Sequence, residues 1–99
     1  MKIYISGPIT GIPDGNRRAF SMASMQLDIA GHESVSPHNN GLPADASWQE
    51  HMRADIRILM DCEGMALLPG WRQSKGAQIE RDLALSVGIV VKPLEEWLP

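Results

Sequence analysis

The stretch that decides the fold is residues 65–91, which read MALLPGWRQSKGAQIERDLALSVGIVV. Met65–Leu68 is an apolar run ended by a Pro-Gly pair, which predicts a buried strand followed by a loop. Ser74 as N-cap and Gly88 as the C-terminal stop delimit a helix, and Ile89–Val91 predicts a second buried strand. A helix that joins two strands in this way makes them parallel neighbours through a right-handed crossover.

The alternation of strands and helices continues outward from this stretch to the N-terminus. Strands are predicted at Ile3–Ile5 and, more weakly, at His32–Ser36. Helical patterns run from Asn16 to Ala30 and from Trp48 to about Asp61. We therefore expect a single domain over residues 1–99, of the α/β class. Its core is a parallel sheet with strand order 2-1-3-4 and helices on both faces, a three-layer flavodoxin-like or Rossmann-like architecture.

This topology predicts where a ligand binds. In such sheets the site lies at the carboxyl ends of the strands, where the strand order reverses. Here that crevice falls between the loops after the first and third strands, so we expect residues 6–11 and 69–74 to line it.

Composition excludes several classes of function. The chain has 99 residues and a net charge of −3, and its basic residues form no run, which argues against a nucleic-acid partner. No apolar run is long enough to span a bilayer, and the N-terminus has no signal-peptide pattern, so no membrane partner is expected. Cys62 is the single cysteine, which excludes an internal disulfide and fits a cytoplasmic location.

A carboxylate occupies an apolar position in the helix after Ser74. Residues three and four apart share a helix face, and Glu80 shares its face with Ala77, Ala84 and Val87. Burying an unpaired carboxylate costs several kcal/mol, so such a group has a partner or a task. The ordinary interpretation pairs Glu80 with Arg81, Arg72 or Lys75. The functional one makes it a nucleophile or acid in a pocket wall, with Gly76 leaving open space beside it.

Asp55 repeats this anomaly on the preceding helix. It lies in the apolar row that includes Met52 and Leu59. Its ordinary interpretation is a buried Asp satisfied by a backbone group or an arginine. Glu80 and Asp55 thus lie on the core-facing rows of consecutive helices. Cleavage of a glycosidic bond needs such a pair of carboxylates, one as the nucleophile and the other for proton transfer or orientation.

Further candidates surround the predicted crevice. Tyr4 ends the first strand, where it is either a core residue or a group that reaches the crevice with its hydroxyl. The loop residues Ser6, Gly7, Pro8 and Thr10 lack a phosphate-loop pattern but offer backbone N–H groups to a ligand. Trp48 and Trp71 either fill the core or cover a base, and Trp71, just after Pro69-Gly70 at the crevice, is the better placed for stacking. The three histidines have no metal-ligand spacing, so neither a metal nor another cofactor is expected.

The chain resembles the nucleoside 2-deoxyribosyltransferase-like superfamily, which includes the deoxynucleoside monophosphate N-glycosidases. Three segments carry the resemblance: the strand and loop at residues 3–11 (IYISGPITG), Asp55 with Asp61 before a strand, and the spacing of Gly76, Glu80, Ala84 and Gly88. A small bacterial and phage branch is the most similar. It shares Pro13-Asp14, Gly31-His32, Trp48, Leu68-Pro69-Gly70-Trp71 and Ser74-Lys75-Gly76-Ala77.

The resemblance implies an activity and roles for individual residues. Glu80 would be the nucleophile that attacks the anomeric carbon of a (deoxy)ribosyl group, Tyr4 would orient it, and Asp55 would lie near the sugar or base. The substrate would be a nucleoside or nucleotide, bound with help from Ser6, Gly7, Pro8, Thr10, Gly70, Trp71, Ser74 and Gly76. The assembly would be a homodimer or a larger homo-oligomer.

Two departures from the superfamily leave the function open. The transferases use another aspartate after the third strand, where this chain has Leu68-Pro69-Gly70, and Pro8 and Thr10 replace phosphate-contacting residues. The leading hypothesis is N-glycosidic bond cleavage or (deoxy)ribosyl transfer by an enzyme with a Glu nucleophile. The alternative is a non-catalytic module that binds a nucleotide or a nucleotide-derived signal. A third possibility is an interaction protein that kept the fold and lost the pocket.

Overall fold

The computed structural model describes residues 1–99. Four strands and three α-helices alternate along the chain, and short 3-10 turns follow most of the strands. The elements are β1 (Lys2–Ser6), η1 (Pro13–Asn16), α1 (Arg17–Ile29), β2 (Glu33–Val35), η2 (Pro37–Asn39), α2 (Trp48–Met60), β3 (Gly64–Leu67), η3 (Trp71–Gln73), α3 (Lys75–Ser86), β4 (Val90–Pro93) and η4 (Leu94–Trp97).

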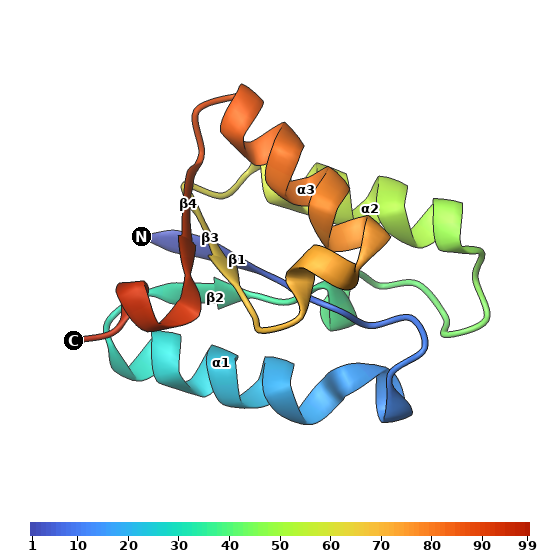
Figure 1. Ribbon diagram of the computed structural model, residues 1–99, viewed down its shortest axis with the longest axis horizontal. Coiled ribbons are helices and arrows are strands. Elements are labelled where there is room, and N and C mark those ends of the chain that lie inside the picture. Colours follow the sequence, from blue (N-terminus) through green and yellow to red (C-terminus); the bar gives the residue numbers. More distant parts are fainter.

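The sheet has the predicted order, β2-β1-β3-β4, and all three pairings are parallel. Figure 1 shows α1 on one face of the sheet and α2 and α3 on the other, so the predicted three-layer α/β architecture is confirmed. None of the helices combines the length and the apolar character that a bilayer crossing requires.

Element boundaries differ from the predictions by one or two residues. The third strand begins at Gly64, one residue early, and the fourth runs from Val90 to Pro93. Val87 was expected on the buried face of α3, and that expectation is wrong, because its side chain is 57% exposed. Val87 is the C-cap of α3, where the helix ends and the chain turns through Gly88, at a φ of +83°, toward β4.

Two apolar clusters hold the layers together, one on each face of the sheet. Side chains of β1 alternate between them, as the period of two in a strand requires. Ile3 and Ile5 pack with Phe20, Leu27 and Trp97 on the face covered by α1 and η4. The cluster under α2 and α3 is formed by Tyr4, Leu59, Cys62, Met65, Leu67, Ala84 and Ile89.

The ring of Trp97 approaches the backbone closely at Gly64, the first residue of β3. A Cβ atom at Gly64 would lie 2.6 Å from Cη2 of Trp97, whose ring covers the start of β3. The Trp97 indole N–H donates to the carbonyl of Met65 at 2.9 Å, which fixes the ring there. This contact ties η4 to the sheet.

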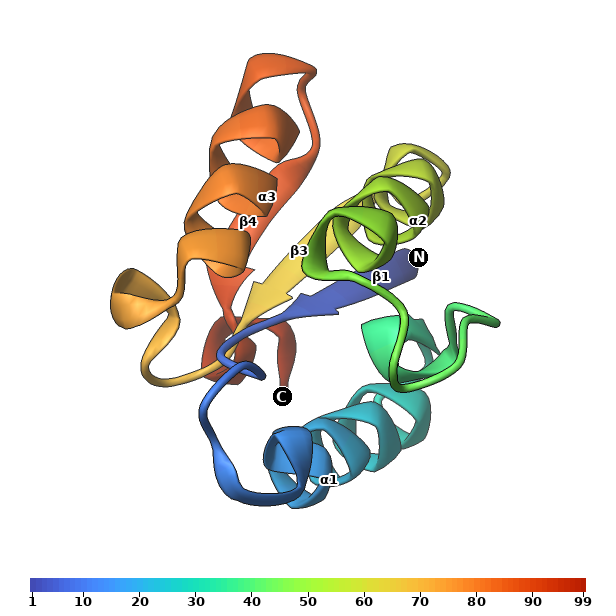
Figure 2. The same cartoon turned by 90° about the vertical axis from the view of Figure 1, so that its right-hand side faces the viewer.

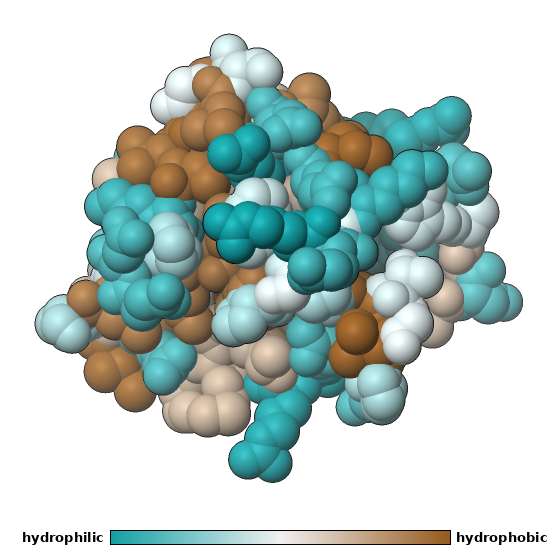
Figure 3. All heavy atoms as spheres, in the orientation of Figure 1, coloured by the Kyte–Doolittle hydropathy of each residue, from teal (hydrophilic) through white to brown (hydrophobic).

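Exposed apolar side chains gather at one place on the surface. In Figure 3 hydrophobic atoms cover the region over the end of α3 and the start of β4, where Leu85, Val87 and Val90 are 44–57% exposed. This patch lies at the amino-terminal end of β4. The predicted crevice is at the opposite, carboxyl-terminal edge of the sheet.

Candidate active site

A cavity of about 1160 Å³ opens at the carboxyl ends of β1 and β3. Figure 2 shows the arrowheads of these two strands side by side, with the loops that leave them diverging to opposite sides. Three segments line the cavity: the loop after β1, the loop after β2 with the first turns of α2, and the loop after β3 with the first turns of α3. Its position is the one that the reversal of strand order predicts.

Glu80 lies in this cavity with only 5% of its surface exposed. The Tyr4 hydroxyl donates to its Oε2 atom at 2.7 Å, and the Ser6 hydroxyl donates to its Oε1 atom at 2.7 Å. Tyr4 and Ser6 are two residues apart in β1, so both side chains project from the face that α3 covers. Each carboxylate oxygen therefore has one hydroxyl donor from the same strand.

The ordinary interpretation of Glu80, an ion pair with a neighbouring cation, does not hold in the structure. The ion pairs present are Arg17 with Asp14 and Arg81 with Asp82, and both are at the surface. Glu80 thus has hydrogen-bond donors but no cationic partner. A carboxylate in this situation remains expensive to ionise, because hydroxyl groups offset only part of the desolvation.

Burial raises the pKa of Glu80 from 4.5 to about 7. The hydrogen bonds from Tyr4 and Ser6 lower it, and the charge of Asp55 raises it further. Burial, followed by the charges of Glu80 and Asp55, also raises the pKa of Tyr4 well above its usual value of 10. The Tyr4 hydroxyl therefore keeps its proton, whereas Glu80 changes charge near neutral pH.

Asp55 is the second buried acid of the cavity, with 6% of its surface exposed. Its partner is neither a backbone group nor an arginine but the side-chain amide of Asn40, which donates to Oδ1 at 2.8 Å. Burial raises the pKa of Asp55, and the Asn40 hydrogen bond lowers it. Because Asp55 and Glu80 belong to one cavity, the structure brings the two predicted acids together.

Most of the predicted binding residues line the cavity. They are Gly7, Pro8, Thr10, Gly70, Ser74 and Gly76. Gly7 allows the first and third loops to approach each other, since a Cβ atom there would lie 2.8 Å from Cβ of Leu68. The hydroxyl of Ser74 accepts from the Ala77 N–H at 3.2 Å, so that it caps α3 as predicted.

Three predictions about this lining need correction. Ser6 is fully buried and does not line the cavity; it supports Glu80 from behind. Gly76 does not leave open space, since a Cβ atom there would lie 3.2 Å from Sδ of Met52, so the glycine lets α2 and α3 approach closely. Trp71 lies outside the cavity and packs against the cluster under α3, while Trp48 is the tryptophan that lines the cavity.

The structure also brings two unpredicted residues, Asn40 and His51, into the cavity wall. Asn40 lies in the loop of residues 37–47, and no sequence pattern indicates that its amide reaches Asp55. His51 has a signal in the sequence, since its position one helical turn before Asp55 places both side chains on the same face of α2. No group of three or more histidine, cysteine, aspartate or glutamate residues is arranged to hold a metal ion.

Comparisons with known proteins agree with the fold. No curated protein matches the chain in sequence. Among solved structures, a 2-deoxyribosyltransferase from the psychrotolerant bacterium Bacillus psychrosaccharolyticus superposes with a TM-score of 0.71 at 20% identity. The match covers 92% of this chain and 69% of that one, which confirms the predicted resemblance at the level of the fold. The model of one protein family matches residues 1–93, and the chain therefore belongs to the family described as "Domain of unknown function (DUF4406)".

Proposed function

We propose that the protein cleaves the N-glycosidic bond of a nucleoside or nucleotide, or transfers its (deoxy)ribosyl group, with Glu80 as the nucleophile. The observation that carries this proposal is a carboxylate that is 5% exposed, held by two hydroxyl donors and open to a cavity that contains a second acid. The likeness to a solved 2-deoxyribosyltransferase supports the same reaction class.

The first step forms a bond between a Glu80 oxygen and the anomeric carbon of the sugar while the carbon–nitrogen bond to the base breaks. The electron pair of the broken bond leaves with the base, which takes a proton from Asp55 or from water. Tyr4 and Ser6 hold one oxygen each and leave a second lone pair on both oxygens for the attack. Positioning of this kind lowers the barrier, because the carboxylate needs no reorientation during the reaction.

The second step releases the sugar from Glu80. The oxygen of a water molecule, or a ring nitrogen of a second base, bonds to the anomeric carbon, and Glu80 leaves as a carboxylate. The proton of the attacking group passes to Asp55 or to solvent. Hydrolysis and transfer differ only in which of these acceptors occupies the cavity at that moment.

Base release is the first test of this proposal. The protein is incubated with deoxynucleosides, ribonucleosides and their monophosphates, and free base is measured by chromatography. We expect Glu80→Gln to reduce base release at least about a thousandfold, since it removes the nucleophile. Glu96→Gln, which changes an exposed glutamate, is the matched control and keeps full activity. Base release that survives Glu80→Ala contradicts the role of Glu80.

Direct detection of the covalent intermediate is the second test. A nucleoside with fluorine beside the anomeric carbon slows the release of the sugar, so the intermediate accumulates. Mass spectrometry should then find the added pentosyl group on the peptide that contains Glu80. A label on another residue, or turnover with no label, would contradict nucleophilic catalysis by Glu80.

One observation favours a second candidate function, the binding of an intact nucleotide without turnover. The loop after β3 carries no carboxylate in Leu68-Pro69-Gly70, so the chain has no additional acid there to act on a base. In that case nucleotides raise the melting temperature, no base is released under any condition, and Glu80→Gln retains binding. Turnover by the native protein decides between the two candidates.

A further inference from the structure

The hydrogen bonds of Asn40 determine the tautomer of His51. The backbone N–H of Leu42 donates to Oδ1 of Asn40 at 3.0 Å, and a backbone N–H can only donate. This contact identifies Oδ1, so the other end of the amide is the nitrogen Nδ2. The reverse orientation would place the amide nitrogen against the Leu42 N–H and the amide oxygen against Asp55, which is unfavourable at both ends.

The Nδ2 group of Asn40 then has two hydrogens and two neighbours. One neighbour is Oδ1 of Asp55 at 2.8 Å, and the other is Nδ1 of His51 at 3.0 Å. Since an amide NH₂ only donates, Nδ1 of His51 must accept and carries no proton. The ring of the neutral histidine therefore has its proton on Nε2.

Nε2 of His51 has no partner within the protein. His32 contains the one buried side-chain nitrogen without a hydrogen bond, so Nε2 of His51 is open to solvent. The His51 side chain lines the cavity that contains Glu80 and Asp55. An oriented N–H donor is thus available to a ligand there.

We propose that His51 is a substrate-contacting residue, whose Nε2–H donates to a ring nitrogen or carbonyl oxygen of the departing base, and that Asn40 is a positioning residue for both His51 and Asp55. This inference rests on the proposed function, since it concerns the base that Glu80 displaces. When the carbon–nitrogen bond breaks, negative charge develops on the base, and a fixed donor stabilises it most at that stage. The substrate class is accordingly a nucleoside or nucleotide whose base has an acceptor that can reach His51.

The tautomer is tested without any turnover. Nitrogen-15 spectra of the histidine rings should show His51 in the native protein with its proton on Nε2 and none on Nδ1. In Asn40→Ala the constraint is lost, so we expect a mixture of the two tautomers. A native His51 with its proton on Nδ1, or an unchanged spectrum in Asn40→Ala, overturns the role of Asn40.

Binding of free bases is tested in the same spectra. Adenine, guanine, cytosine and uracil are each titrated into the native protein, and we expect at least one to shift the Nε2–H resonance of His51. An analogue that lacks the contacted acceptor, with carbon in place of a ring nitrogen or hydrogen in place of a carbonyl oxygen, should bind without that shift. If no base moves the resonance, the inference fails, whatever the outcome for Glu80.

Turnover tests the catalytic part. We expect His51→Ala to lower kcat about a hundredfold with a smaller change in KM, as for the loss of one donor to developing charge. His51→Gln, whose amide can still donate, should recover part of the rate, and Arg53→Ala, an exposed change on the same helix, should have no effect. With a substrate whose base lacks the contacted acceptor, the native protein and His51→Ala should react at the same rate. An undiminished effect on that substrate would indicate a structural role only.

Discussion

The two faces of β1 have opposite characters although they alternate along only five residues. On the face covered by α1, Ile3 and Ile5 belong to an apolar cluster that includes Phe20 and Leu27. On the face covered by α2 and α3, Tyr4 and Ser6 donate hydrogen bonds to a buried carboxylate. Burial of apolar side chains on the first face stabilises the fold. On the second face, burial of a carboxylate that pairs with no cation lowers the stability. One strand therefore supports both the core and the candidate site.

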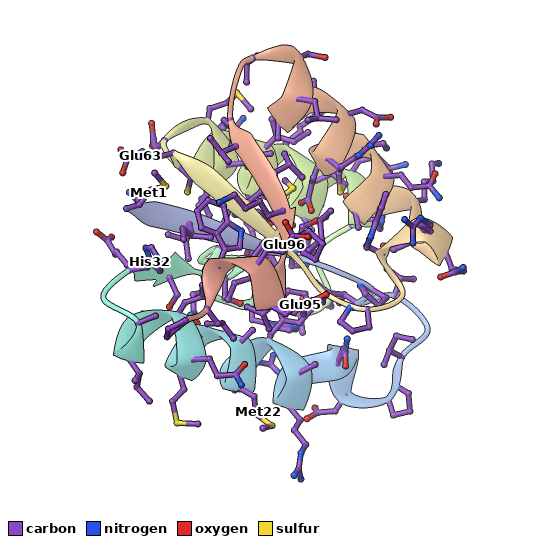
Figure 4. All side chains as sticks on the ribbon, turned by 60° about the vertical axis from the view of Figure 1, so that its left-hand side comes forward. Met1, Met22, His32, Glu63, Glu95 and Glu96 are labelled. Carbon is purple, nitrogen blue, oxygen red and sulfur yellow. The ribbon has the colours of Figure 1, made fainter.

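The largest effect is expected on the apolar face. Phe20→Ala should reduce the free energy of unfolding by about 3–5 kcal/mol, because the Phe20 side chain is 1% exposed and leaves a cavity when truncated. Denaturant titration measures this change. Met22→Ala is the control, since Met22 lies on the outer side of the same helix and points away from the sheet in Figure 4. It should change stability by less than about 0.5 kcal/mol. Equal effects of the two substitutions would contradict the division into faces.

On the polar face, Glu80→Gln should increase stability, and only at higher pH. The unfolded chain releases the Glu80 proton near pH 4.5 and the folded chain near 7, so the native state binds more protons between these values. The Glu80 contribution to stability therefore falls as pH rises through this window, by about 3 kcal/mol in total. Glu80→Gln should remove this dependence, with little gain near pH 4 and most of the gain near pH 8. Urea titrations across this range measure it, and a gain that is independent of pH would contradict the buried charge.

The hydroxyl of Tyr4 should have a smaller but measurable effect on the same carboxylate. Tyr4→Phe removes a hydrogen bond that favours the charged form, so the pKa of Glu80 should rise above 7. A carbon-13 spectrum of the Glu80 carboxyl group follows this titration directly. At pH 8, where Glu80 of the native protein is mostly charged, the loss of this hydrogen bond costs about 1.5–3 kcal/mol. Ser6→Ala should move the pKa in the same direction, whereas Ser24→Ala, at a hydroxyl on the other side of the molecule, should leave it unchanged.

The smallest effect is expected from the cap of α2, the helix that carries Asp55. The Ser47 hydroxyl accepts from the Glu50 N–H at 3.0 Å, and Glu50 accepts in return from the Ser47 N–H at 3.1 Å. Ser47→Ala should reduce stability by about 1 kcal/mol. Thermal unfolding measures this loss, and the pKa of Glu80 serves as a second measurement that should remain the same. A changed pKa would mean that α2 and the polar face are more tightly coupled than the hydrogen bonds indicate.

The fold was predictable because its signals are local. Every strand except β2 contains a short apolar run, glycine or proline lies at or just after the end of each strand, and the amphipathic rows of the helices indicate which residues face the sheet. Strands that alternate with helices favour a parallel sheet, and right-handed crossovers restrict the strand orders that it can have. The errors are confined to element ends, such as Val87, where the helix turns away from the sheet before its pattern ends.

The two acids and most of the loop residues near them were predictable, whereas the contacts of Asp55 were not. Glu80 and Asp55 stand out because a carboxylate in an apolar row is visible in the sequence. The contact of Asn40 with Asp55 depends on how residues 37–47 fold back against α2, and no local pattern encodes that path. The same applies to the tryptophans, since Trp71 follows the crevice loop but packs against the cluster under α3 and contacts the side chains of Arg72 and Arg81.

The hydrogen bond between Tyr4 and Glu80 joins residues 76 positions apart in the chain. During synthesis Tyr4 therefore leaves the ribosome long before Glu80 is made. The polar face of β1 is covered only after β3 and α3 have formed. No N-terminal fragment that stops short of α3 can hold the carboxylate. Recovery of the Glu80 titration during refolding would accordingly report that the whole chain, and not one half of it, has reached its native arrangement.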